Sequence, residues 1–407
     1  MATKQKTYNV GGVQLDRPFK IRRLGHFGFN VVDMDAGVHF YRNLLGFKMS
    51  DMNNFAANPE RAKLLKEKGI EDARGRFFHY GGDHHAFVLF PKTALDAMRG
   101  ADPDNDNNIN QITWQTGSLA EVVNSVDYFA EHEVHINRSG RDMPGSNWHT
   151  YVLDTDGHTN ELYYGMEQIG WDGRSKPLDM YYRKFTEKAT LPQPSEEDEV
   201  EEAIAKGIDI FSGFRDTEDL PRKYDVEGML LARPFKITKI GPVDIFVDDV
   251  DKAAQFYVEE MGFTLTEDVQ HEGNRFAFLR AGTEHHSLSL WPKSKREEMG
   301  FWKGSTCVSF GVEVGSYEQL RNAVAFLKEQ GVEIRDVPTD LHPGVDYTVY
   351  AIDPEGHAIQ LYAYMENVGW QGSPRGGGMH TPVAEWPETI APVSDSFADQ
   401  MYMGPLG

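Results

Sequence analysis

The sequence predicts an α+β protein of two domains, each a pair of βαβββ modules that forms a curved, half-open mixed sheet around a central cavity. Three observations lead to this prediction. The chain has 407 residues, enough for two domains of ordinary size. Its segment 10–25 returns in recognisable form at 226–241, which indicates an internal duplication. Within each half, strand-like and helix-like runs follow one another in the same order twice.

The duplication sets the domain boundaries. VGGVQLDRPFKIRRLG matches VEGMLLARPFKITKIG, and HHAFVLFPK matches HHSLSLWPK further along. The spacing between matched positions falls by some residues along the chain, as small loop deletions would cause. We therefore predict an N-terminal arm at 1–9, a first domain at 10–175, a linker with a helix at 176–225, a second domain at 226–375 and a tail at 376–407.

The elements of the first domain follow from local signals. Asp33 or Asp35 is placed to cap a helix that Gly46 ends, and Ser118 is placed to cap a helix that runs through Glu131. Alternating apolar residues bounded by turn residues predict the strands around these helices. We expect strands at 26–32, 85–90, 111–116, 148–153 and 161–164, with one or two more between the first pair.

The linker and the tail differ from the domains in composition. Ser195 is a helix cap followed by a run of acidic residues, and Gly207 ends the predicted helix. The acidic run is interpreted as a solvated face. The Gly- and Pro-rich tail predicts an extended arm or an unstructured segment.

Composition excludes several function classes. The formal net charge of −22 argues against nucleic acid as a partner, because phosphate binding needs basic patches. No run approaches 18 apolar residues, so we expect no membrane span. The single cysteine, Cys307, excludes an internal disulfide framework, and the N-terminal residues have no apolar signal region. A cytoplasmic location is the expectation.

Glu161 is the most unusual residue of the first domain. It lies in the second strand of a predicted hairpin, where a buried carboxylate is rarely placed without a role. His149 and Tyr151, two residues apart in the partner strand, point to one face. The second domain keeps the hairpin but carries Gln360 where the first carries Glu161. The charge in the first copy therefore indicates a function.

Two further polar residues hold comparable places in their modules. His26 opens the first strand of module one, and Gln111 opens the first strand of module two. The aligned residues of the second domain are Pro242 and a residue near Cys307, and together with Gln360 they form no convincing metal set. The first domain thus has a candidate His/Gln/Glu triad, and the second domain is interpreted as structural. A hydrogen-bonded core histidine is the alternative for His26.

The words HHAFVLF, DTDGHTNELYY and DPEGHAIQLY, together with four strand–helix–three-strand units, resemble the vicinal oxygen chelate superfamily. The two-domain build resembles the type I extradiol catechol dioxygenases, over roughly 20–173 and 236–372. In that family two histidines and a glutamate hold a divalent metal, usually Fe(II). The resemblance implies His26, Gln111 and Glu161 as metal ligands. Two departures are Gln111 in place of the second histidine, and a triad in the N-terminal half.

The amide of Gln111 would change the metal preference. An amide oxygen is a harder and weaker donor than an imidazole, so affinity should fall and preference should move toward Mn(II) or Mg(II), with Fe(II) still possible. Some glyoxalases of the same superfamily use a glutamine ligand. Fe(II) remains the first expectation and Mn(II) or another divalent metal the second.

The resemblance also implies catalytic residues. His85, or His84, takes the position of the family's active-site histidine, and Tyr151 that of the tyrosine that hydrogen-bonds the substrate. His149 is a candidate to replace a further family histidine that is missing near Asp142. A packing role is equally open for the His84–His85 pair, since both halves carry it. Aromatic walls of a substrate site, with core packing as the alternative, are predicted at Trp148, Trp114 and Phe87.

Three functions remain open at this point. The first is a metal-dependent extradiol-type dioxygenase that cleaves a catechol- or hydroquinone-like aromatic with O2. The second is a metal-dependent lyase, isomerase or hydrolase that stabilises a chelated enolate, which the hard Gln111 donor favours. The third is a metal-free protein that binds a small molecule. A homo-oligomer is expected for any of them, because modules of this superfamily usually pair.

Overall fold

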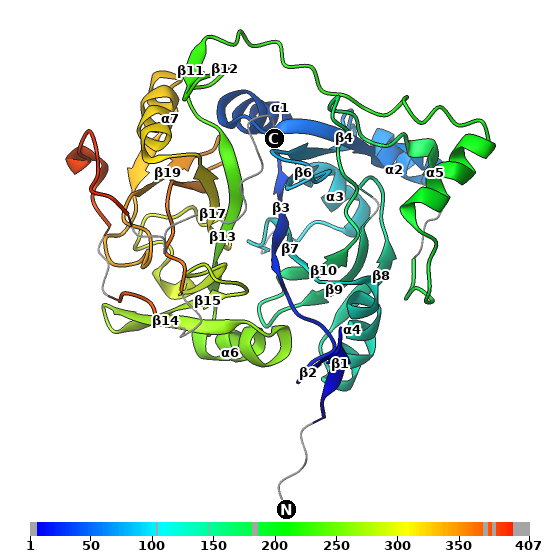
Figure 1. The fold of residues 1–407 in the computed structure, drawn as a ribbon, viewed down its shortest axis with the longest axis horizontal. Helices are drawn as coiled ribbons and strands as arrows, with labels where there is room; N and C mark the ends of the chain where they lie inside the picture. Colours follow the sequence, from blue (N-terminus) through cyan, green and yellow to red (C-terminus); the bar gives the residue numbers. More distant parts are fainter. Residues whose placement is uncertain are drawn as a thin grey trace, which may run out of the picture.

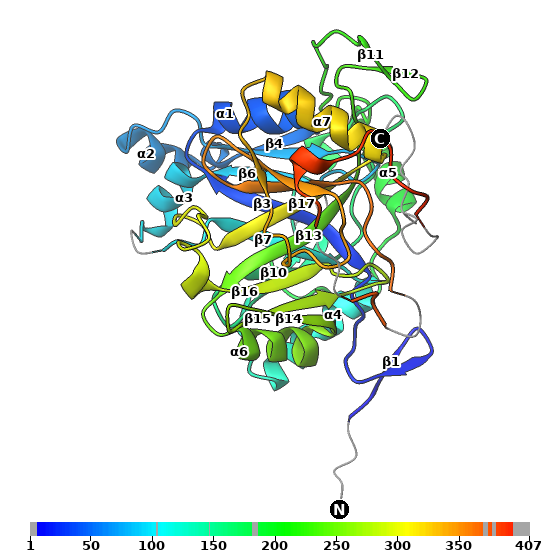
Figure 2. The same cartoon turned by 90° about the vertical axis from the view of Figure 1, so that its left-hand side faces the viewer.

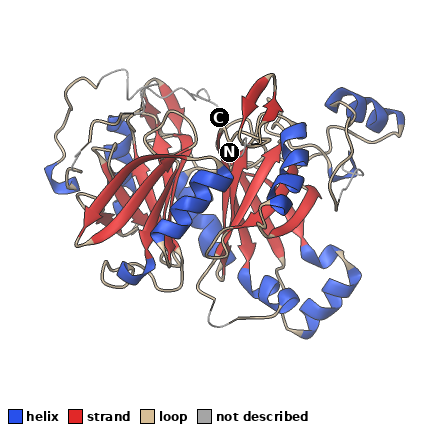
Figure 3. Cartoon of the chain, turned by 90° about the horizontal axis from the view of Figure 1, so that it is seen from below, coloured by secondary structure: helices blue, strands red, loops and turns tan. Residues whose placement is uncertain are grey.

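The structure is a computed structural model that describes residues 6–102, 105–145, 147–180, 186–368, 373–376 and 380–393. Of the predicted arm and tail, residues 1–5, 377–379 and 394–407 lie outside the described residues. Two bodies lie side by side, the first half in blue to green-cyan and the second in green to orange (Figure 1). Figure 3 shows the strands of each body gathered into its own sheet, with helices around them.

Each body contains one eight-stranded mixed sheet. The strand orders are β4-β5-β6-β3-β7-β10-β9-β8 in the first half and β14-β15-β16-β13-β17-β20-β19-β18 in the second. The central pairs β3–β7 and β13–β17 are antiparallel and join the two modules of each half. Both outer strands of each sheet are unpaired at one side, so neither sheet closes. The predicted fold class, with two βαβββ modules per half, is confirmed.

The first half follows the predicted order. Its strands are β3 (Arg23–Val31), β4 (Lys48–Asn54), β5 (Arg74–His79), β6 (Phe87–Pro91), β7 (Ile109–Gln115), β8 (Ile136–Arg141), β9 (Trp148–Leu153) and β10 (Thr159–Tyr164). Its helices are α1 (Met34–Val38), the π-helical segment η1 (His39–Leu45), the 3₁₀ turn η2 (Phe55–Ala57), α2 (Pro59–Glu67), α3 (Lys92–Arg99) and α4 (Leu119–Glu131).

The second half repeats this order without counterparts of α2 and α3. Its strands are β13 (Ile237–Val247), β14 (Thr264–His271), β15 (Asn274–Arg280), β16 (Leu288–Pro292), β17 (Cys307–Val314), β18 (Ile334–Asp336), β19 (Thr348–Ile352) and β20 (Ala358–Tyr362). Its helical segments are α6 (Val250–Gln255), η4 (Phe256–Met261), η5 (Lys293–Lys295) and α7 (Tyr317–Glu329). Figure 2 faces this half, with α7 at the top of the view and α6 at the bottom.

Short elements connect or flank the sheets. They are the hairpins β1 (Tyr8–Val10) with β2 (Val13–Leu15) and β11 (Tyr224–Val226) with β12 (Met229–Leu231), helix α5 (Glu196–Ala205), and the turns η3 (Leu178–Met180) and η6 (Val383–Glu385). The first hairpin includes residues that the sequence assigned to a loose arm. No helix in the described part of the chain is both long and apolar enough for a membrane span.

The predicted caps are present. The Asp33 carboxylate accepts from the backbone of Ala36, and the Ser118 hydroxyl accepts from that of Glu121. Ser195 forms a full capping box with Asp198. Each cap satisfies backbone N–H groups that the first helical turn leaves without partners, which is why these helices begin where they do.

Apolar side chains join the two halves into one core. The Phe27 ring stacks on Phe310 of the second half with centroids 4.8 Å apart, and Trp114 meets Phe263 at 4.8 Å. All four rings are at least nine-tenths buried. The hydrophobic effect therefore stabilises the pairing of the halves as well as each sheet.

Two reciprocal hydrogen-bond clusters also link the halves. In one, Asp154 accepts from His158 and from the hydroxyl of Tyr257, a residue of the second half, at 2.9 and 2.8 Å. In the other, Asp353 accepts from His357 and from the hydroxyl of Tyr41 at 2.8 and 3.0 Å. Both histidines therefore take part in contacts between the halves.

Candidate functional site

The candidate site lies on one face of the first sheet, which we call the inner face. Paired residues of neighbouring strands direct their side chains to the same face. One row crosses five strands and consists of Arg138 (β8), Tyr151 (β9), Glu161 (β10), Thr113 (β7) and His26 (β3). Gln111 and His149 lie on this face in the adjacent rows, two residues from Thr113 and Tyr151.

His26 and Glu161 are in direct contact. Nε2 of His26 lies 3.1 Å from Oε2 of Glu161, and both side chains are fully buried. They come from β3 and β10, which are separated by β7, so the row geometry of the sheet brings them together. The sequence prediction that these two residues share a site is consistent with this contact.

Two neighbours hold the Glu161 carboxylate in place. The Thr113 hydroxyl donates to Oε2 at 2.9 Å, and the Asn147 amide donates to Oε1 at 2.6 Å. Burial alone would raise the pKa of Glu161, but the charge and hydrogen bond of His26 outweigh it and hold the pKa below its ordinary value. Glu161 is therefore an anion with a fixed orientation.

Gln111 is bonded to Tyr151 rather than to the pair itself. The Tyr151 hydroxyl donates to Oε1 of Gln111 at 3.4 Å. The guanidinium of Arg138 lies over the Tyr151 ring, 4.3 Å from its centroid. Burial, followed by the charge of Glu161, raises the pKa of Tyr151 well above its ordinary value. Tyr151 is thus a neutral hydrogen-bond donor on the inner face.

His85 joins the site from the turn before β6. Its ring centroid is 4.3 Å from that of His26, and its Nδ1 is 3.0 Å from Nδ1 of His84. Burial, followed by the charges of His26 and His84, lowers the pKa of His85 well below its ordinary value. A Cβ on Gly145, which has a φ of +95°, would lie 2.7 Å from the His85 ring, so only glycine fits there.

His149 and His84 occupy the edges of this cluster. The His149 ring is 4.7 Å from that of Tyr151, and burial lowers its pKa. Nδ1 of His149 lies 3.9 Å from the Asp142 carboxylate, beyond hydrogen-bond distance. Nε2 of His84 lies 3.8 Å from Asp51. Both edge histidines are buried and neither touches the His26–Glu161 pair through a recorded hydrogen bond.

The three aromatic residues predicted as substrate walls face away from the inner face. Trp114 donates to Asn160 at 2.9 Å and packs on the second half. Phe87 stacks among core rings, including Phe310 at 5.4 Å. Trp148 is in the opposite strand phase to His149 and Tyr151, and it packs with Val123 of α4. These side chains serve the core, which was the alternative considered for them.

The donor set can be tested against a divalent metal ion. Among the described residues, no three His, Cys, Asp or Glu side chains are grouped closely enough to hold an ion. The separation of 3.1 Å between His26 Nε2 and Glu161 Oε2 matches two neighbouring ligands bound about 2.1–2.2 Å from a shared ion. Nδ1 of His26 is buried without a partner among the described residues. The pair therefore fits a metal, provided that an amide oxygen supplies a third donor.

Sequence reasoning missed three contributors to the site. Thr113 was detectable, because it lies two residues after Gln111 and so shares its face. Asn147 lies in the turn before β9, and Arg138 lies on the edge strand β8. No residue pattern marks either of them, since their roles depend on how the edge of the sheet folds back over Glu161.

The register also corrects the alignment of the two halves. Gly28 pairs with Gln111 in the first sheet, and its counterpart Asp244 pairs with Ser309 in the second. Ser309, not Cys307, is therefore the second-half counterpart of Gln111. The prediction failed because the segment between the His pair and this strand is shorter in the second half: the offset falls from 286 − 85 = 201 at His85 to 309 − 111 = 198 at Gln111.

Solved structures share this architecture. The Mn(II)-bound glyoxalase from Novosphingobium aromaticivorans is 15% identical, with a TM-score of 0.51 over 92% of this chain and 96% of that one. The 2,3-dioxygenase LapB from Pseudomonas sp. KL28 is 17% identical, with a TM-score of 0.54 over 87% and 96%. Homoprotocatechuate 2,3-dioxygenase from Arthrobacter globiformis is 16% identical, with a TM-score of 0.54 over 90% and 86%. At this identity the likeness concerns the fold.

Sequence comparison gives the family. A search of curated proteins found no match. The family model described as the glyoxalase/bleomycin resistance protein/dioxygenase superfamily matches residues 23–162 and 239–361, which is more than half of the chain and one segment in each sheet. The four βαβββ modules agree with that match. The chain therefore belongs to the glyoxalase/bleomycin resistance protein/dioxygenase superfamily.

Proposed function

We propose that the protein is a metal-dependent, extradiol-type dioxygenase that cleaves the ring of a catechol- or hydroquinone-like aromatic with O2. The observation that carries the proposal is the buried His26–Glu161 pair, with the imidazole of His85 and the hydroxyl of Tyr151 on the same inner face. A buried ion pair is weak evidence for stability, because removing both groups from water is costly. The pair and the two side chains beside it bring four reactive groups together, which supports a catalytic role.

The metal would be held by His26 and Glu161, with the Gln111 amide oxygen as the third donor. A divalent ion held there would supply a common binding position for a diol and O2 and a route for electrons between them. Fe(II) suits this chemistry best, and Mn(II) is the alternative that the amide donor favours. The Asn147 amide is close enough to Glu161 to compete with Gln111 for the third position.

The protein groups around the pair have distinct roles in this proposal. Tyr151, neutral and fixed by Arg138, donates a hydrogen bond to a substrate oxygen. His85 is neutral at pH 7, so its imidazole can take a proton from the second substrate hydroxyl and later return it. Its Nδ1 faces His84, which leaves Nε2 for the proton. His149 orients Tyr151 from the side and excludes water.

A second candidate is a non-redox enzyme that stabilises a chelated enolate. The donor set favours it, since one imidazole, one carboxylate and one amide suit hard, redox-inert ions. In this case His85 and Tyr151 would still move and donate protons. Bound Mn, Mg or Zn without oxygen uptake would support this function instead of the first.

Anaerobic purification followed by metal analysis and oxygen-uptake assays tests the proposal. We expect about one iron per chain, oxygen uptake on a small panel of catechols and hydroquinones, and a yellow ring-fission product. No stoichiometric metal, before or after reconstitution, would remove both enzyme functions and leave a metal-free binding protein. Light scattering on the same sample tests the predicted homo-oligomer.

A further inference from the structure

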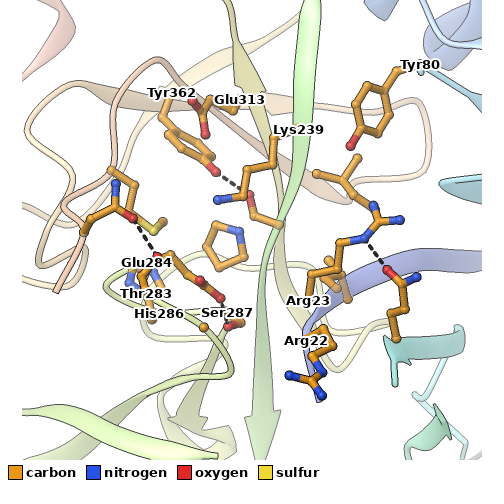
Figure 4. A pocket seen from close by; sticks show the side chains of 18 residues that line it. Arg22, Arg23, Tyr80, Lys239, Thr283, Glu284, His286, Ser287, Glu313 and Tyr362 are labelled. Carbon is orange, nitrogen blue, oxygen red and sulfur yellow. Dashed lines mark hydrogen bonds between the residues drawn. The ribbon is translucent and has the colours of Figure 1, made fainter. Parts of the chain in front are cut away.

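A cavity of about 480 Å³ lies between the two halves, away from the His26–Glu161 pair. Figure 4 shows its two walls, with Arg22, Arg23 and Tyr80 on one side and Lys239, His286 and Tyr362 on the other. The volume suits a ligand of drug-fragment size. Neither His26 nor Glu161 lines it.

The second-half wall contains the counterparts of residues that form or surround the metal pair in the first half. Pro242 is the counterpart of His26, and His286 is the counterpart of His85. Both line the cavity, and Tyr362, the last residue of β20, lies beside them. A proline offers no side-chain donor, so this half presents a cavity without metal ligands where the first half presents a packed cluster.

The charges in the lining are unequally satisfied. Arg23 is paired with Asp83 and donates to Gln115 at 2.5 Å. Lys239 and Arg22 have no ion-pair partner among the residues that the structure describes. The Arg22 side chain points away from Lys239 (Figure 4), with its guanidinium beside Gly117 and Glu121, so Lys239 is the cation that a ligand in the cavity would meet.

The carboxylates of the lining have partners. Glu284 accepts a hydrogen bond from the Ser287 hydroxyl. Glu313 is 5% exposed and has an interaction partner of its own. A bound anion would therefore meet the unpaired ammonium of Lys239 in this cavity rather than unsatisfied carboxylates.

His286 supplies a second, independent sign of a ligand. Its side chain is 1% exposed and lines the cavity, yet Nε2 has no hydrogen-bond partner among the described residues. Leaving such an atom unsatisfied is costly, and buried polar atoms in native proteins nearly always have a partner. Burial, followed by the charges of His285 and His342, lowers the pKa of His286, so it is a neutral donor or acceptor.

The remaining lining is apolar. Leu24, Ile240 and Met365 contribute hydrophobic surface between the charged groups. We propose that the second half binds a small organic anion, a carboxylate on an apolar or aromatic body, with the carboxylate at Lys239 and a polar contact to His286. The second half is then a metal-free ligand site as well as a scaffold. This inference does not depend on the proposed dioxygenase activity.

Calorimetric titration of the full-length, metal-stripped protein tests this site. The probes are benzoate, benzyl alcohol, which keeps the ring without the charge, and acetate, which keeps the charge without the ring. We expect benzoate to bind one site per chain with a Kd on the order of 0.1–1 mM, the scale for so small a ligand. Benzyl alcohol and acetate should bind about tenfold more weakly or not at all.

Variants assign the binding to the cavity. Lys239→Met should weaken benzoate binding by about tenfold, as expected for loss of a charge-assisted hydrogen bond. Arg22 is exposed and points away from Lys239, so Arg22→Gln should bind as the wild type does. Lys328→Met, an exposed lysine on α7, is the matched control and should bind as the wild type does.

Three results would overturn the inference. They are no saturable benzoate binding by the wild type, wild-type affinity in Lys239→Met, and loss of binding in Glu161→Gln with no loss in Lys239→Met. The last result would assign the ligand to the inner face of the first half. None of these measurements uses turnover, so failure of the dioxygenase proposal would leave them interpretable.

Discussion

The inner faces of the two halves have the same backbone and different chemistry. The row that reads His26, Thr113, Glu161, Tyr151, Arg138 in the first half reads Pro242, Gly311, Gln360, Tyr350, Arg335 in the second. The tyrosine and the arginine, on the two strands nearest the sheet edge, are kept, and the other three residues of the row are replaced. Since the second sheet forms without the His/Thr/Glu set, the fold does not require it.

The second half has a different hydrogen-bond network at these positions. Its network is neutral where the first is charged: Gln360 contacts His342 at 3.1 Å, and His342 contacts the Tyr350 hydroxyl at 2.6 Å. Among the described residues no cation lies beside the Asp244 carboxylate, which accepts from Ser289 and Ser309. On the inner face, the described residues hold a buried histidine–carboxylate pair in the first half and none in the second, which supports a function for it there.

Converting the first half toward the second should have the largest effect. Glu161→Gln removes the only carboxylate in the row while the amide still accepts from Thr113. We expect loss of bound metal and a fall in activity of at least about 10³-fold, with the thermal unfolding midpoint nearly unchanged. Metal analysis, oxygen uptake and thermal unfolding measure the three quantities.

The reverse change in the second half is the matched control. Gln360→Glu should not create a second metal site, because Pro242 has no donor to offer. One metal per chain in Gln360→Glu and none in Glu161→Gln would show that only the first half binds the metal. Retained turnover in Glu161→Gln would remove Glu161 from the site.

His85 gives the next largest effect. His85→Gln should keep the metal and lower kcat by about 10²–10⁴-fold, the usual contribution of a proton-transferring imidazole. Anaerobic metal content and steady-state oxygen uptake separate the two effects. Wild-type kcat would show that the His84–His85 pair serves packing in both halves, and loss of folding would assign His85 to the core.

The fold and half of the site were accessible from sequence because their signals are local or periodic. Strand phase put His149 and Tyr151 on one face, and cap residues such as Ser118 fixed where helices begin. The same phase rule places Trp148 on the opposite face, so its proposed role as a substrate wall already conflicted with the assignment of Tyr151.

The remaining features depend on packing between distant segments. The bond from Asn147 to Glu161 needs the edge of the sheet to fold over β10, and the irregular pairing of β3 with β7 decides that Thr113, not Gln111, lies opposite His26. The use of His158 as an inter-half contact requires knowledge of how the halves meet. No spacing within one segment encodes these facts.

Asp244 predicts a pH effect that only the second half should show. Burial raises its pKa to about 6, whereas its first-half counterpart is Gly28. Because the folded state holds this proton more tightly than the unfolded state, stability should fall as pH rises from about 4 to about 6, by about 2–3 kcal/mol, and level off above. Asp244→Asn should lack that fall, so the free energy of unfolding of the variant minus that of the wild type should increase over this window.

Denaturant unfolding at several pH values measures this difference. The hydrogen bond from Arg74 lowers the pKa of Asp72 to about 2, so Asp72→Asn, in the first half, should show no change over this window and serves as the comparison. A pH-independent difference between Asp244→Asn and the wild type would mean that the carboxylate is ionised throughout, with the serine hydroxyls stabilising its charge.

The smallest expected effect concerns the two reciprocal hydrogen-bond clusters between the halves, which we call the clamps. Their arrangement is nearly the same in both directions. Tyr41→Phe removes one hydrogen bond to Asp353, and Tyr257→Phe removes one to Asp154 and one from Asn160. Each lost bond to a buried carboxylate costs about 1–2 kcal/mol, so both variants should be destabilised and Tyr257→Phe by more. Tyr164→Phe, at a 37% exposed tyrosine, is the control. Equal losses in the two clamp variants would mean that the Asn160 bond contributes nothing net, and that the halves hold each other by equal contacts even though only one carries the charge pair.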